Sequence, residues 1–335
     1  MSQHDGMYDG FGFSEATNGM LNRYKINHES TYPTRKSDLK QFEGWVRDAE
    51  PGDVLDVGRN DIEDYIYWLA GEGYAPGTVY KKYYSVYTLY DDLAGRGEID
   101  ENPTENVEPK DYKGVMNTGT RKSEVTHEEL TAITPEEKEL LVEHAPTPKL
   151  RNELVLRLLW QTSVRQGELA SVRLTDIDRE NHSIRIRATK THRNRLVGYQ
   201  PSLDVLMNRW LDGGGRASYK YAHETDENGN KYLLLSERNP KMKAELNKIV
   251  KKAADNARIQ EVLYTDQRGN PQHRITAHSF RHGSAVQCLR NGMNIRQLQL
   301  HLGHENIETT KRYLQMTQDE VVNAVHAYGA GTETA

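Results

Sequence analysis

The chain has 335 residues, of which 36% are apolar and 28% charged, and its net charge is −5. This length is enough for two domains, each with its own core. No apolar run reaches the roughly 18 residues that a membrane helix needs, and the first twenty residues lack the basic start and apolar core of a secretory signal. We therefore expect a cytoplasmic protein without a membrane partner. A single cysteine, Cys288, excludes a disulfide within the chain.

The charge is divided unevenly along the chain. Residues 21–112 contain 11 lysines and arginines against 19 acidic residues, whereas residues 113–316 contain 33 against 24. If the protein has a polyanionic partner, this partner is therefore expected to meet mainly the second half.

The first half is typical of a helical domain, which we place at residues 21–112. Three helical patterns follow one another, with apolar residues recurring at intervals of three and four. The first begins near Pro33, the second is expected to be capped by Asn60 or Asp61, and the third begins at Pro76. Residues 1–20 precede them and are interpreted as a flexible, glycine-rich arm.

A linker is predicted at residues 113–125, because the surrounding stretch is rich in proline and glycine and has almost no apolar periodicity. The second domain follows over residues 126–316. Its first helices are announced by Thr-x-x-Glu capping boxes that start at Thr126 and Thr134.

The second domain is predicted to be mixed α+β and mainly helical. A leucine-rich helix spans roughly 149–162, and the apolar period then changes to two over 182–189 and 195–200, which indicates an antiparallel hairpin. Helical patterns return after the hairpin, and two of them end at Gly292 and Gly303.

Polar side chains recur in this domain at positions where a core normally has none. They are Arg165, with Glu168 three residues later; Lys190 at the hairpin; His278 and Arg281, which share a helix face; His304, just after a glycine; and Tyr313, nine residues further on. Two guanidiniums can hold a phosphate and absorb the charge that grows on its oxygens. A tyrosine can attack phosphorus when cations and a base lower its pKa from about 10, and a lysine can protonate the leaving sugar oxygen. The set is sufficient for phosphoryl transfer without a cofactor, metal or ATP.

The order and spacing of these residues resemble the tyrosine recombinase family, the lambda-integrase type of site-specific DNA recombinase. The resemblance is carried by SVRQGELASVRLTDID, the hairpin lysine, HSFRHGSAVQCLRNG and LQLHLGHENIETTKRY, and it covers residues 126–316. It implies a catalytic domain with the DNA breaking-rejoining fold. More loosely, it implies that the first half is an all-α core-binding domain, a SAM-like helical bundle.

The resemblance also implies a role for each polar residue. Tyr313 would be the nucleophile, with Arg165 and Arg281 clamping the scissile phosphate and Lys190 protonating the leaving 5′ oxygen. His304 would bond a non-bridging oxygen, His278 would assist proton transfer or orient the phosphate, and Glu168 would support the cluster. The candidate DNA contacts are Lys81, Lys82, Arg187, Arg193 and Arg195.

The expected partner is double-stranded DNA at a specific recombination site, with four protomers acting on two duplexes. The helix and tail at residues 317–335 would dock on a neighbouring protomer. The preferred role is integration or excision of a virus or mobile element, with an archaeal host suggested by the acidic first half. A Xer-like chromosome-dimer resolvase is the alternative, and a type IB topoisomerase is a less favoured one.

Two alternatives lie outside this chemistry. A metal protein could use His278, His282, His301 and His304, but the sequence lacks the glutamate of H-E-x-x-H and offers no cysteine or carboxylate nearby. A DNA-binding regulator without catalysis is disfavoured because every expected catalytic position is filled.

Overall fold

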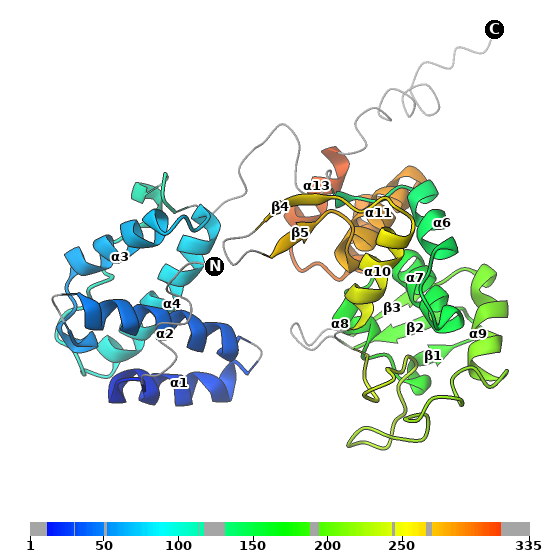
Figure 1. Ribbon diagram of the computed structural model, residues 1–335, viewed down its shortest axis with the longest axis horizontal. Helices are drawn as coiled ribbons and strands as arrows, with labels where there is room; N and C mark the ends of the chain where they lie inside the picture. The colour runs from blue at the N-terminus through cyan, green and yellow to red at the C-terminus, as the bar shows by residue number, and fades with distance from the viewer. Residues whose placement is uncertain are drawn as a thin grey trace, which may run out of the picture. The chain divides into compact units, whose positions relative to one another are not determined.

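The chain forms two units, seen in a computed structural model (Figure 1). One consists of Met1–Lys122 with Thr265–Asn270, and the other of Ser123–Tyr264 with Pro271–Ala335. The structure describes residues 12–29, 31–49, 52–112, 114–116, 131–187, 194–242, 245–265 and 270–315. No helix in this described part is both long and apolar enough to cross a membrane.

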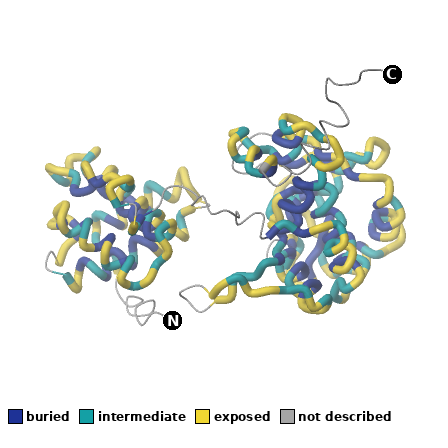
Figure 2. The backbone as a smooth tube through the Cα atoms, turned by 90° about the horizontal axis from the view of Figure 1, so that it is seen from above, coloured by how far each residue is buried: buried dark blue, intermediate teal, exposed yellow. Residues whose placement is uncertain are grey.

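The first unit is a helical bundle, as predicted. Its main helices are α1 (Glu15–Asn27), α2 (Tyr32–Asp48), α3 (Arg59–Gly71) and α4 (Pro76–Gly95), and a 3-10 helix follows at Pro109–Tyr112. The apolar stripes of α2, α3 and α4 face one another and form the core, which Figure 2 shows as a buried interior. Val107 and Met116 close this core from beyond α4.

Two local predictions for the first unit were wrong. Residues 15–20, expected in a flexible arm, lie in α1, where Ser14 caps the helix and Met20 is buried. The N-cap of α3 is Gly58 rather than Asn60 or Asp61, and the carboxylate of Asp61 instead accepts a hydrogen bond from the Gly58 backbone N–H at 2.8 Å. The capping side chain thus lies inside the first turn of the helix.

The second unit is mainly helical with small antiparallel sheets, which confirms the predicted fold class. Its helices are α6 (Pro135–Glu143), α7 (Lys149–Thr162), α8 (Gln166–Leu169), α9 (Asp204–Leu211), α10 (Glu245–Asn256), α11 (Ala277–Arg290), α12 (Ile295–Leu302) and α13 (Glu308–Gln315). The predicted hairpin is present as β2 (Ser183–Ile186) and β3 (Arg195–Gly198), with β1 (Ile177–Asp178) added to its edge. A second sheet of β4 (Val262–Thr265) and β5 (Pro271–His273) was not predicted.

The core of the second unit lies around α7, whose leucines pack against α11 and the inner face of the sheet. The capping box at Thr134 is confirmed: its hydroxyl accepts from the Glu137 N–H, and the Glu137 carboxylate accepts from the Thr134 N–H. The box predicted at Thr126 lies outside the described residues. Because α7 and α11 are both buried, side chains at their ends are held on a rigid base.

Candidate active site

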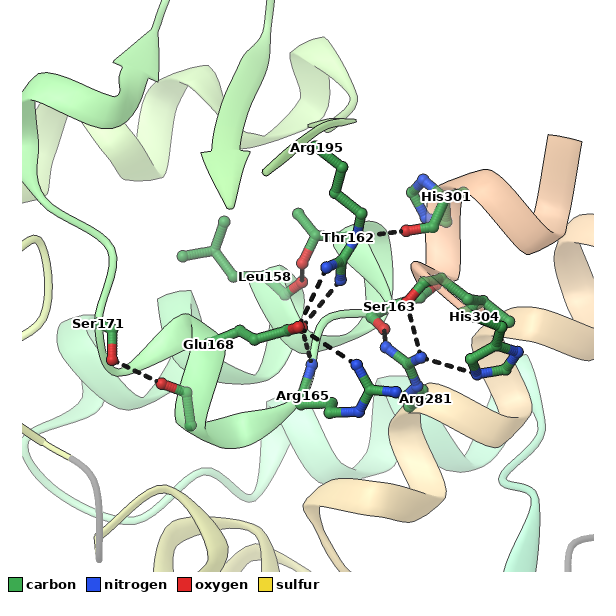
Figure 3. Close-up of polar contacts among 12 residues, drawn as sticks. Leu158, Thr162, Ser163, Arg165, Glu168, Ser171, Arg195, Arg281, His301 and His304 are labelled. Atoms are coloured by element: carbon green, nitrogen blue, oxygen red, sulfur yellow. Dashed lines mark hydrogen bonds and ion pairs between the residues drawn. The ribbon is translucent and has the colours of Figure 1, made fainter. Parts of the chain in front are cut away.

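Arg281 is the most buried charged residue of the site and lies on α11 with 1% of its surface exposed. Its Nη1 donates to the backbone carbonyl of Ser163 at 2.7 Å, and its Nη2 donates to the carbonyl of Leu302 at 2.8 Å and to Nε2 of His304 at 3.0 Å (Figure 3). Burial, together with the nearby Arg165, lowers the pKa of Arg281 to about 10, so it stays charged at neutral pH. The guanidinium is therefore fixed by the turn after α7 and by the end of α12.

His304 is held as a neutral ring. A guanidinium can only donate hydrogen bonds, so Nε2 of His304 accepts from Arg281, and its Nδ1 lies 2.9 Å from the hydroxyl of Thr310. Burial and the positive charge of Arg281 lower the pKa of His304 to about 3. A hydrogen bond from Nε2 to a phosphate oxygen, the role expected of this residue, requires the ring to take up the other tautomer.

Glu168 links three parts of the site. Arg195 on β3 donates to its two carboxylate oxygens at 3.0 and 2.8 Å, and the backbone N–H of Arg165 donates to it at 2.9 Å. Arg195 also donates from Nε to the carbonyl of His301 at 2.9 Å. Burial raises the pKa of Glu168, but the hydrogen bond and charge of Arg195 outweigh this effect and leave the pKa below its usual value. The carboxylate is therefore ionised and ties β3 to the start of α8.

Arg165 is the exposed member of the cluster. It precedes α8, and 48% of its side chain is exposed; its Nη1 donates to Glu168 at 3.3 Å. Arg165 and Arg281 approach closely enough for the charge of the first to depress the pKa of the second. Figure 3 shows their guanidiniums on the same side of the site, as two residues that share one phosphate must be.

Tyr313 lies on α13, which packs against α11. Its side chain is 2% exposed, and its hydroxyl lies 2.9 Å from Nδ1 of His282. The ring of His278, one turn earlier on α11, packs edge to face on His282 with 4.2 Å between ring centroids. Arg281 on α11 interacts electrostatically with the Tyr313 hydroxyl, so the expected nucleophile and the expected phosphate clamp lie close together on two packed helices.

The charges of this cluster do not balance. Among the described residues, three guanidiniums, those of Arg165, Arg195 and Arg281, gather around one carboxylate, that of Glu168. The nearby His304 is neutral. The surplus positive charge, half-exposed at Arg165, is an arrangement that attracts an anion.

Lys82, predicted as a phosphate contact, is instead part of the core of the first unit. Its ammonium donates to Gln41 at 2.6 Å and pairs with Asp38 at 3.3 Å, and it is 5% exposed. A lysine enclosed by its own partners cannot reach a DNA backbone, so this prediction was wrong. Its neighbour Lys81 is exposed on α4 and stays a predicted contact.

The basic residues of the hairpin differ in the contacts that they make. Arg195 was predicted to contact DNA. In the structure its side chain donates to the Glu168 carboxylate and the His301 carbonyl, so it supports the site from within, and a contact with DNA stays a prediction. Arg187 is exposed and pairs with the buried Asp176. Lys190 and Arg193 lie outside the described residues, and their roles stay predictions.

Sequence reasoning missed what Arg195 and His282 do. The sequence held one sign of the position of Arg195, which is the glycine at 303. A Cβ added to Gly303 would lie 2.8 Å from the Arg195 guanidinium, so the glycine leaves room for this side chain, and it also adopts a φ of +68°. His282 was considered only as a metal ligand. Within the described ranges, no group of three or more histidine, cysteine or acidic side chains is placed to hold a metal ion.

The chain is similar to known recombinases and integrases. The model of the phage integrase family matches residues 131–320. The tyrosine recombinase XerC of Roseiflexus sp. (strain RS-1) is 25% identical over 309 residues, which are 91% of this chain and 89% of the relative. The tyrosine recombinase XerA of Thermococcus onnurineus (strain NA1) is 29% identical over 197 residues, 58% of this chain and 61% of that one.

Solved structures share the fold. The XerH site-specific recombinase bound to palindromic difH substrate, in a post-cleavage complex, superposes with a TM-score of 0.67 at 16% identity and covers 93% of this chain and 85% of its own. The Tn1549 transposon integrase in complex with transposon right end DNA gives 0.64 at 17% identity, covering 93% and 99%. These likenesses confirm the fold that the resemblance implied.

Proposed function

This chain belongs to the phage integrase family and is a tyrosine-type site-specific recombinase, and we propose that Tyr313 is the residue through which it cleaves and rejoins DNA. The observation that carries the proposal is the surplus of guanidinium charge around Arg281, next to the helix that bears Tyr313. A DNA phosphate supplies the anion that this cluster lacks. Double-stranded DNA is the proposed partner.

The proposed reaction has two steps. The Tyr313 oxygen attacks the phosphorus, the bond to the 5′ oxygen breaks, and the protein is left attached to a 3′ phosphate. Arg165 and Arg281 hold the non-bridging oxygens, where negative charge grows during displacement. The 5′ hydroxyl of the same or a second duplex then attacks the phosphotyrosyl bond and releases the protein.

Lys190 is proposed to protonate the leaving 5′ oxygen, as its place in the motif implies. Glu168 and Arg195 are proposed to hold Arg165 in position, because Glu168 bonds both arginines. Exchange between duplexes requires several copies, and we propose four protomers on two duplexes.

The biological role that we propose is integration or excision of a mobile element. The second candidate, a Xer-like chromosome-dimer resolvase, is favoured by one observation: the XerC relative matches nearly the whole chain. Sequencing the DNA to which the protein becomes attached separates the two. Ends of a mobile element support the first role, and a single chromosomal site without such an element supports the second.

The test of the chemistry uses sheared genomic DNA from the source organism, followed by denaturation to trap covalent complexes. The wild-type protein should yield DNA that stays attached after denaturation. Tyr313→Phe should bind the same DNA in a mobility-shift assay and yield no attached DNA. Attachment by Tyr313→Phe at the wild-type level would refute the assignment of the nucleophile.

A further inference from the structure

The nucleophile proposed above has a direct hydrogen-bond partner that the motif does not name. The Tyr313 hydroxyl lies 2.9 Å from Nδ1 of His282, and both side chains are buried, at 2% and 3% exposure. A buried hydroxyl and a buried imidazole in contact restrict each other to one geometry. His282 therefore reaches the one oxygen on which the reaction depends.

The chemistry of the pair suits transfer of a proton. In the tautomer with its proton on Nε2, the imidazole accepts the phenolic hydrogen at Nδ1. A phenol with a pKa of about 10 is almost wholly protonated at neutral pH, so attack on phosphorus requires a base that removes this proton as the new bond forms. An imidazole in direct contact is the side chain best suited to do so.

We propose that His282 is the general base for Tyr313, an inference that rests on the function proposed above. As the Tyr313 oxygen bonds to phosphorus and the bond to the 5′ oxygen breaks, the phenolic proton passes to Nδ1 of His282. The negative charge of the departing alkoxide is neutralised by a separate proton donor at that oxygen. In the reverse step Nδ1 returns its proton to the tyrosine oxygen as the phosphotyrosyl bond breaks, so the pair regains its starting state.

The surroundings of the pair favour this direction of transfer. On α11, His278 packs on the His282 ring and Arg281 interacts electrostatically with the Tyr313 oxygen. His304, in the turn before α13, is neutral and bonded to Arg281, and Arg165 adds positive charge next to Arg281. Arg312, one residue before Tyr313 on α13, adds positive charge near His304. The positive charge of Arg281 stabilises the phenolate as it forms.

The position of His282 on α11 adds a geometric reason. Arg281 and His282 are consecutive on a buried helix, so the group that holds the phosphate and the group that accepts the proton share one backbone. A phosphate held by Arg281 consequently lies near the oxygen that His282 contacts. A base on a separate, mobile segment would need to be brought into place for each turnover.

The test measures single-turnover cleavage by His282→Gln on a nicked form of the duplex that the trapping experiment recovers. Glutamine keeps a polar side chain but cannot take up a proton. The expected loss is about 10²- to 10³-fold at neutral pH, with unchanged DNA binding. His144→Gln is the matched control, because His144 lies at the end of α6 and makes an exposed hydrogen bond, in which its Nδ1 lies 2.9 Å from the backbone carbonyl of Leu140.

The pH profile separates a base from a purely structural role. Without His282, cleavage depends on spontaneous ionisation of Tyr313, so the ratio of wild-type to variant rate should shrink by about tenfold per pH unit towards the pKa of the phenol. Taking the ratio cancels the titration of groups that both proteins share. A constant ratio at all pH values, a variant as fast as wild type, or a variant that is faster would overturn the proposal.

A second measurement keeps the proposal open to refutation if His282→Gln does not fold. The ¹⁵N NMR resonance of His282 Nδ1 should shift between wild type and Tyr313→Phe, while the resonances of His144 stay in place. An unshifted Nδ1 resonance would contradict the hydrogen bond. If the wild-type protein forms no covalent adduct, both proposals fail; if it does and His282→Gln matches it, only the role of His282 fails.

Discussion

Each unit of the molecule contains a buried polar cluster, and the two clusters differ in charge balance. In the first unit, the Lys82 ammonium meets the Asp38 carboxylate and the Gln41 amide oxygen, and Ser85 donates to the second oxygen of Asp38. One positive charge faces one negative charge. In the second unit, three guanidiniums surround one carboxylate among the described residues.

The difference separates a structural network from a binding site. A cluster whose donors, acceptors and charges are satisfied from within has nothing to offer a ligand, and it serves to fix the packing of its helices. A cluster with surplus charge is costly until an anion arrives. Charge balance, read residue by residue, therefore distinguishes the two roles where composition does not.

The largest effect on activity is expected at Arg165, the exposed member of the arginine cluster around Glu168. Arg165→Ala should lower the cleavage rate by about 10²- to 10³-fold, because it removes a donor from the phosphate. Its exposed ion pair with Glu168 contributes little to stability, so the thermal unfolding midpoint should stay within about 2 °C of wild type. Single-turnover cleavage and calorimetry on the same preparation check both parts. A large fall in the midpoint would mean that Arg165 belongs to the structural kind of cluster.

Substitution in the Lys82–Asp38 cluster of the first unit should lower stability and leave DNA binding unchanged. Lys82→Met leaves the buried Asp38 carboxylate unpaired and should destabilise the first unit by about 3 kcal/mol, with Lys82→Met/Asp38→Leu recovering part of the loss. Chemical unfolding of the full chain measures this effect. The salt dependence of DNA binding should not change. A slope of log K against log salt that falls by about one would instead reveal a phosphate contact at Lys82.

Substitution of Arg195 tests whether this side chain supports Glu168 or contacts DNA. Arg195→Gln should slow cleavage by about 10- to 100-fold through loss of its two bonds to Glu168, while the salt slope of binding stays at the wild-type value. Arg185→Gln, on the exposed face of β2, is the matched change of charge. A reduction in slope of about one for Arg195→Gln, with unchanged cleavage at saturating DNA, would restore its predicted role as a DNA contact.

The smallest expected effect concerns acid stability. Burial and the charges of Arg195 and Arg281 lower the pKa of His301 to about 4, and its Nε2 is buried without a hydrogen-bond partner among the described residues. Below the unfolded-state pKa of about 6.5, the unfolded chain binds a proton that the folded protein does not, so stability falls as the pH decreases towards 4. Between pH 7 and 5 the loss should be about 2 kcal/mol, and smaller in His301→Gln. Equal losses in both proteins would exclude His301 as a cause.

The sequence predicts the fold class, because helix periodicity and the hairpin are local patterns. The short motifs around Arg165, Arg281 and His304 nominate the candidate site residues, whose roles stay predictions. The sequence could not separate Lys82 from Lys81. The two are adjacent on one helix, and their different burial follows from how α2 and α4 pack. The same holds for Arg195, whose partners lie 27 and 106 residues away. Long-range pairing of polar groups leaves little trace in one sequence.

Several short elements could not be predicted from the sequence either. The strands β4 and β5 have four and three residues, too few for a period of two to be visible against their neighbours. The start of α1 was missed because its apolar residues are few and surrounded by glycine and asparagine. The contact between His282 and Tyr313 joins residues 31 positions apart on two helices and depends on how these helices pack.

The central claim is that the arginine cluster around Glu168 holds a DNA phosphate for attack by Tyr313. Mass spectrometry of the trapped adduct, after digestion with nuclease and protease, tests it most directly. The account predicts a nucleotide joined through its 3′ phosphate to the peptide that contains Tyr313, with a free 5′ hydroxyl on the released strand. A nucleotide attached to any other residue, or joined through a 5′ phosphate, would contradict it.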